Sequence, residues 1–143
     1  MENIAILMGG TSEERAISLK SAHTIYQNID TNKYNAYKVL HLVNKQFVII
    51  DSNNEIIIDA KDFSFTIASQ KIKFDKVFMM IHGNPGENGE LCQYFEHKKI
   101  PYTSCNEKVS KLTFHKFKCN NYLRTLGYKV PQSYIFNKEH NIK

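Results

Sequence analysis

The sequence lacks the long hydrophobic run that a membrane span requires. No apolar segment among its 143 residues approaches the roughly 20 residues that cross a bilayer. The amino-terminal residues 1–8 are too short, and lack the basic start, that a signal peptide needs. Internal repeats and low-complexity stretches are also missing. We therefore expect a soluble, cytoplasmic protein that does not bind a membrane.

Cysteine is scarce, and its distribution excludes two common uses of this residue. The chain has three cysteines, an odd number, and Cys92, Cys105 and Cys119 do not have the spacing of metal ligands. Incidental reduced thiols, as in a cytosolic protein, are what this pattern favours. The sequence predicts no metal site.

Positive charge is in only modest excess. The 19 Lys and Arg residues against 14 Asp and Glu give a net charge of +5, while 42% of residues are hydrophobic, as in a folded domain. A nucleic-acid-binding protein would gather basic residues on one face, but here the lysines are spread along the chain, with a slight excess from Lys98 to Lys129. Nucleic-acid binding, which would show a steep salt dependence, is therefore not expected.

Two continuous apolar runs each lead into a loop that contains glycines. Residues 3–8 and 76–81 are predicted to be buried strands, because continuous apolar sequence is typical of a parallel sheet covered on both faces. Gly9 and Gly10 follow the first strand, and the loop 82–89, with three glycines, follows the second. Open α/β sheets bind ligands just past the carboxyl ends of their strands. The two loops therefore predict one shared ligand crevice.

The segment after the first loop has the pattern of an amphipathic helix. Thr11 and Glu14 fit a capping box, which predicts a helix that starts at Thr11 or Ser12. Helical spacing predicts that one face of it packs on the core, through Leu19, Ala22, Tyr26 and Ile29.

The rest of the chain alternates between strand and helix patterns. Strands are predicted at 37–43 and 100–103, with a hairpin of 47–50 and 55–58 inserted at the sheet edge; residues 60–73 give no clear pattern. A helix is expected after the second loop, and a longer one over 107–126, stopped by Gly127. Its candidates for burial are Val109, Leu112, Phe117, Tyr122 and Leu126, and residues 130–136 could begin another strand. Together these elements predict an α/β doubly wound, mainly parallel sheet with an edge hairpin.

Three side chains near the predicted crevice are candidates for binding a ligand. Glu14 could hold a ligand ammonium, although the alternative is that it only completes the helix cap. His82 ends a buried strand and can donate or accept near neutral pH, or else it only bonds neighbouring backbone. Lys116 could reach a phosphate as a point charge, or could simply be solvated.

Three segments in this order closely resemble the D-alanine–D-alanine ligase family: 9–15, 82–91 and 112–116. The segments Ile100–Thr103 and Leu126–Pro131 are similar to that family as well. The resemblance spans most of the chain apart from about residues 44–73. It implies a Rossmann-like amino-terminal domain over residues 1–106, followed at 107–143 by the connecting helix and first strand of an ATP-grasp domain.

The resemblance also implies a reaction and roles for the candidate residues. The family joins two D-alanines with ATP and Mg²⁺, through an acyl phosphate, for peptidoglycan synthesis. Glu14 matches the glutamate that holds the ammonium of the first D-alanine, and His82 matches a histidine beside that substrate. Gly9, Gly10 and Ser12 belong to the same substrate-binding loop. Lys116 matches a lysine that contacts ATP phosphates, although His115 stands where the family usually has Asp. A homodimer is expected.

The length of the sequence leads to a further expectation about activity. The family's Mg²⁺ ligands and most of its nucleotide pocket come from sequence beyond these residues, so this chain alone is expected not to turn over ATP. The alternative function is a non-catalytic α/β module that binds a small anion or nucleotide and regulates a partner.

Overall fold

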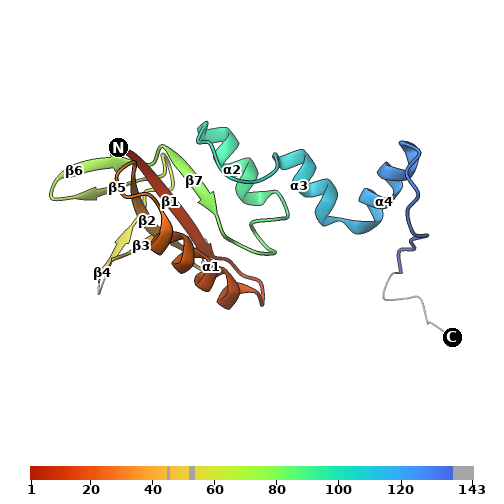
Figure 1. Ribbon diagram of the computed structural model, residues 1–143, viewed down its shortest axis with the longest axis horizontal. Helices are drawn as coiled ribbons and strands as arrows, with labels where there is room; N and C mark the ends of the chain where they lie inside the picture. Colours follow the sequence, from red (N-terminus) through yellow and green to blue (C-terminus); the bar gives the residue numbers. More distant parts are fainter. Residues whose placement is uncertain (45, 52–53, 137–143) are drawn as a thin grey trace.

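The fold is built on a five-stranded mixed sheet with the strand order β4-β3-β2-β1-β7, which lies at one end of the molecule (Figure 1). It is seen in a computed structural model that describes residues 1–44, 46–51 and 54–136. Strand β1 (Glu2–Gly9) pairs in parallel with β2 (Tyr34–His41) and with β7 (Lys76–Met79). The predicted hairpin forms β3 (Phe47–Asp51) and β4 (Asn54–Ile57), which extend the sheet edge in antiparallel fashion. The α/β class and the edge hairpin are confirmed, but the mainly parallel sheet is wrong, because the hairpin is part of the sheet itself.

Both faces of β1 are buried, as its continuous apolar sequence predicted. Ala5 and Leu7 belong to one hydrophobic cluster, and the alternate residues Ile4 and Ile6 belong to another. Successive side chains of a strand point to opposite faces. Helix α1 (Arg15–Asn28) packs on the second face, and helix α2 (Glu90–Lys98) packs on the first. The sheet therefore lies between two layers.

A second hairpin completes the layer on the α2 side. It is formed by β5 (Ser64–Ile67) and β6 (Gln70–Lys73), in the region that gave no clear sequence pattern. The adjoining Phe63 is fully buried, and its ring centroid lies 5.0 Å from that of Phe95 and 5.1 Å from that of Phe74. Its aromatic contacts bring segments from across the sequence into one core. Periodicity could not reveal this cluster, because its members come from unrelated elements.

Helix α1 presents a different face from the one its apolar residues predicted. Ala22 is buried and Ile29 packs against the core, but Leu19 and Tyr26 are exposed. The inward position belongs instead to Ser18, which is fully buried. Its Oγ accepts from the Gly9 N–H at 3.0 Å and donates to the Met80 carbonyl at 2.6 Å. Two hydrogen bonds to adjacent strand ends thus fix how the helix is rotated.

The predicted capping box is also wrong. The residue at the helix N-cap is Glu14, and no side chain caps this end. The hydroxyls of Thr11 and Ser12 instead donate to carbonyls of the second glycine loop, at 3.4 Å and 2.7 Å. Contacts between distant segments therefore replace the local cap.

The carboxyl-terminal region contains two helices where one was predicted. Helix α3 (Glu107–Phe114) and helix α4 (Lys116–Thr125) are separated at His115, whose Nδ1 accepts from the Lys118 N–H at 3.4 Å. The two helices lead away from the sheet (Figure 1), and no residue of α4 is buried. Val109, Tyr122 and Leu126, three of the expected core residues, are exposed.

The end of α4 follows the sequence prediction, but the strand after it does not. Gly127 has a φ of +85° and its N–H donates to the Arg124 carbonyl, as expected of a glycine that stops a helix. Residues 130–136 form no strand, and residues 137–143 lie outside the described part of the chain. Residues 100–103 form only a single parallel bridge, between Tyr102 and Val77. Within the described residues, no helix is both long and apolar enough to span a bilayer.

We predict that Ser18→Ala destabilises the domain by about 1–3 kcal/mol, because it leaves a buried donor and a buried acceptor without their partner. Thr24→Ala is the matched control: it removes an exposed hydroxyl of the same helix that donates to the Lys20 carbonyl. Its effect should stay within about 0.5 kcal/mol. Denaturant unfolding measures both changes, and equal losses of stability would contradict the assignment.

Candidate functional site

The two glycine loops lie against each other at the carboxyl ends of β1 and β7. The Thr11 N–H donates to the Asn84 carbonyl at 3.1 Å, next to the bond from Ser12 to the His82 carbonyl. A Cβ on Gly10 would lie 2.7 Å from Cγ2 of Ile81. The two loops therefore lie at one shared edge of the sheet, as the strand ends predicted, and their close contact depends on the small size of glycine.

A cleft of about 650 Å³ opens beside these loops. This volume is in the range of small-molecule sites. The two loops contribute Ser12, Glu14, Gly83, Asn84 and Glu87 to its lining. Residues 104–116 form the rest of the lining, the cleft wall, through Ser104, Cys105, Ser110, Thr113, Phe114 and Lys116. The cleft thus combines both glycine loops with the start of α4, which are distant in sequence.

Three of the residues predicted for the site line this cleft: Ser12, Glu14 and Lys116. The Glu14 side chain extends over the second loop, because its Oε2 would lie 3.4 Å from a Cβ on Gly83. Gly9 and Gly10 are buried and have positive φ angles of +100° and +88°. They shape the loop from beneath rather than line the cleft.

His82 lies at the joint between the loops. Its carbonyl accepts from Ser12, and its ring Nε2 is buried with no hydrogen-bond partner among the described residues. Buried polar atoms are rarely left unpaired. His82 is not among the residues that line the cleft, so its place beside a substrate stays a prediction.

Arg15 has a supporting role that the sequence did not identify. Its guanidinium donates to the Gly10 carbonyl at 2.9 Å and to the His41 carbonyl at 3.1 Å. It therefore joins the first glycine loop to the end of β2. The only sequence signal was its place in the first turn of the helix, which does not reveal a partner on another strand.

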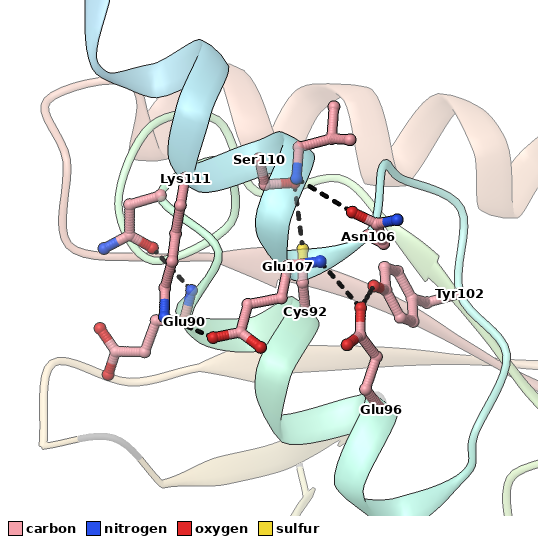
Figure 2. Close-up of polar contacts among 10 residues, drawn as sticks. Glu90, Cys92, Glu96, Tyr102, Asn106, Glu107, Ser110 and Lys111 are labelled. Atoms are coloured by element: carbon pink, nitrogen blue, oxygen red, sulfur yellow. Dashed lines mark hydrogen bonds and ion pairs between the residues drawn. The ribbon is translucent and has the colours of Figure 1, made fainter. Parts of the chain in front are cut away.

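The segment that begins the cleft wall is held by hydrogen bonds to Glu96 (Figure 2). One carboxylate oxygen of Glu96, on α2, accepts both the Tyr102 hydroxyl at 2.6 Å and the Glu107 N–H at 2.8 Å. These hydrogen bonds, the Tyr102 hydroxyl first, lower the pKa of the Glu96 carboxyl below its usual range. Burial and the bond to Glu96 raise the pKa of the Tyr102 hydroxyl.

Two further contacts attach α3 to α2 and its preceding loop. A buried link joins the Cys92 thiol to the Ser110 hydroxyl, with Sγ and Oγ 3.5 Å apart (Figure 2). A Cβ on Gly89 would lie only 2.7 Å from Cγ of Lys111 and 3.0 Å from the Glu107 carbonyl oxygen. Helix α3 therefore packs directly on the end of the second glycine loop.

The described residues do not provide a metal centre. No group of three or more His, Cys, Asp or Glu side chains among them could hold a metal ion.

Comparison with known proteins identifies the family. The family described as "D-ala D-ala ligase N-terminus" matches residues 3–105. The D-alanine–D-alanine ligase of Phocaeicola vulgatus is 44% identical over 135 residues, which are 94% of this chain and 42% of that protein. The chain thus spans less than half the length of this relative.

Two solved structures share the fold. A D-alanine–D-alanine ligase from Aeromonas hydrophila has a TM-score of 0.82 at 23% identity, with 99% of this chain and 53% of that chain covered. The Bacillus anthracis ligase, solved as a complex with ATP, has a TM-score of 0.73 at 24% identity, with 100% and 43% covered.

Fold and site together define an α/β domain that forms a small-molecule cleft at the ends of its parallel strands. The chain belongs to the family of D-alanine–D-alanine ligase amino-terminal domains.

We predict that Gly83→Ala destabilises the domain more than Gly127→Ala does. Both glycines have positive φ, at +65° and +85°, so alanine is strained at each, by about 1–2 kcal/mol. Only at Gly83 would the new methyl group meet another residue, with Cβ of Ser12 at 2.9 Å, whereas nothing lies within 4 Å at Gly127. Overpacking should add about 1–3 kcal/mol at Gly83. Thermal unfolding compares the variants, and equal shifts would disprove close loop packing.

We predict that Glu96→Gln removes a pH-dependent part of the stability. Because the folded-state pKa of Glu96 is lowered, the stabilisation is present above the unfolded pKa and is lost as the pH falls through the folded value. The stability difference between the parent and Glu96→Gln should therefore be present at pH 7 and shrink below about pH 4. Denaturant unfolding across this range measures it, with exposed Glu55→Gln as the control. A difference that does not vary with pH would contradict the prediction.

Proposed function

We propose that this chain is the amino-terminal, D-alanine-binding portion of a D-alanine–D-alanine ligase. The ligase joins two D-alanines with ATP, through an acyl phosphate, for peptidoglycan synthesis in the cytoplasm. The observation that supports this best is that Glu14 and Lys116, which are distant in sequence, line one cleft. Membership of the ligase family supports the same conclusion.

Glu14 provides the negative charge that an amino-acid ammonium requires. Its carboxylate lies over the second glycine loop, where a small zwitterion can approach the backbone closely. A charge-assisted bond from the ammonium would fix the substrate at this end of the cleft. Glu14 therefore binds and orients the first D-alanine, and orientation accounts for a large part of joining two small molecules.

The first loop and His82 complete the proposed substrate site. Ser12 holds the second loop in place through the His82 carbonyl, Gly10 allows the two loops to meet, and Gly9 allows the first loop to pack on the end of β2. The unpaired Nε2 of His82 supplies a group that can donate to or accept from the bound amino acid.

Lys116 begins α4 on the cleft wall, where its ammonium can offset phosphate charge. We assign to it the phosphates of ATP, the nucleotide bound in the related Bacillus anthracis structure. Because Lys116 and Glu14 line the same cleft, the phosphate donor and the D-alanine would bind in one cavity. Mg²⁺ would lower the charge repulsion of phosphoryl transfer, but its ligands are not among the described residues.

Three finer features of the family are part of the same proposal. The domain would be a Rossmann-like, doubly wound domain that precedes an ATP-grasp domain, with the boundary near residue 106. The exposed apolar residues of α4, such as Tyr122, would then pack on the rest of that second domain. The enzyme would form a homodimer.

The test is a chimera in which this chain replaces the matched amino-terminal portion of the Phocaeicola vulgatus ligase. We predict D-alanine-dependent release of phosphate from ATP. Glu14→Gln keeps the shape but removes the charge that holds the ammonium, so it should raise KM for D-alanine roughly tenfold to a hundredfold. Steady-state kinetics at varied D-alanine concentration measures this effect.

Glu13→Gln is the matched control, because it removes the same charge one residue away from an exposed position outside the cleft. Its KM should stay within about twofold of the parent value. An inactive chimera, or equal effects of the two substitutions, would refute the proposal.

A further inference from the structure

Glu96 lies outside the cleft, yet its carboxylate holds residues on both sides of the cleft-lining pair Ser104 and Cys105. It belongs to α2, its partner Tyr102 is bridged to β7 through Val77, and Glu107 begins α3. One carboxylate oxygen thus joins α2, the sheet edge and α3. We name these two contacts, with Tyr102 and with the Glu107 N–H, the Glu96 junction.

The Glu96 junction holds the segment from Tyr102 to Glu107, which leads into the cleft wall, at both of its ends. Tyr102 precedes Ser104 and Cys105, which line the cleft, and Glu107 opens the helix that carries Ser110 and Thr113. At the helix start, backbone N–H groups have no partner within the helix, and a carboxylate there is favoured by the helix dipole. Glu96 supplies such an acceptor from a neighbouring helix.

The other contacts of α3 are either local or do not involve a charged partner. Asn106 caps the helix from within its own segment by accepting from the Val109 N–H at 2.9 Å. The link between Cys92 and Ser110 joins a thiol and a hydroxyl, and the packing on Gly89 is a steric contact. Of these contacts, the bond to Glu96 is the one that joins the first turn of α3 to a carboxylate on α2. The position of this helix end relative to α2 should therefore depend on Glu96.

We propose that Glu96 is a positioning residue of the proposed ligase site, which acts through Tyr102 and the Glu107 N–H to hold the cleft wall and Lys116 at a fixed distance from Glu14. This inference rests on the proposed function, because it assigns a D-alanine to Glu14 and phosphates to Lys116. Glu96 itself touches neither substrate. Its contribution is alignment, to which the rate of a reaction between two bound groups is sensitive.

The first measurement is amide hydrogen exchange on the full chain, which needs no activity. Glu96→Ala removes both hydrogen bonds, so the amides from Glu107 to Ser110 should exchange about 2- to 10-fold faster, while those of β1 stay unchanged. Glu96→Gln keeps an oxygen that can accept both bonds and should restore most of the protection. Gln93→Ala, at an exposed position of the same helix, is the control. Unchanged exchange in Glu96→Ala would overturn the proposal.

The second measurement is the kinetics of the same variants in the ligase chimera. We expect Glu96→Ala to lower kcat about tenfold, with KM for D-alanine within about twofold, because the Glu14 side of the cleft is untouched. Glu96→Gln should recover kcat, and Gln93→Ala should not change it. If Glu96 only stabilised the fold, Glu96→Ala would lower the amount of folded enzyme. The selective fall in kcat at an unchanged KM, and its recovery in Glu96→Gln, would then be absent.

The two measurements separate the possible failures. If the unsubstituted chimera is inactive, the proposed function fails, and exchange alone decides whether Glu96 positions the wall. If exchange accelerates in Glu96→Ala but kcat per folded enzyme is unchanged, the role of Glu96 in the reaction is overturned while the proposed function stands.

Discussion

The close contact between the two glycine loops is the constraint on which the rest of the site depends. The loops meet because Gly10 and Gly83 have no side chains, and because Ser12 donates to the carbonyl of His82. Without this contact the Glu14 carboxylate would not lie over the second loop.

Side chains from distant segments then fix the positions of the loops and of the cleft wall. Ser18 joins the ends of β1 and β7 from beneath, and Arg15 joins the first loop to the end of β2. Glu96 connects the sheet edge to the cleft wall. In each case a polar side chain satisfies backbone groups of another element, so that the geometry of the site is fixed by hydrogen bonds rather than by apolar packing alone.

Sequence patterns predicted the parts of the fold that depend on local order. The continuous apolar run of β1, the edge hairpin and the glycine that ends α4 all have signals within a few residues. The predictions failed where a distant partner outweighed the local pattern. Thr11 and Ser12 bond the second loop instead of capping their own helix, and the rotation of α1 follows the hydrogen bonds of Ser18 rather than the positions of Leu19 and Tyr26.

The sequence alone determined the family and the candidates Glu14, His82 and Lys116, because glycine loops and charged residues at strand and helix ends can be recognised from order along the chain. Only the tertiary structure decided that Glu14 and Lys116 line one cleft and that Gly9 and Gly10 lie beneath it. It alone revealed the Glu96 junction, whose partners are 6 and 11 residues away on different elements. Chain order fixes which groups are present, but the distance between them is set by packing and hydrogen bonds across the sheet.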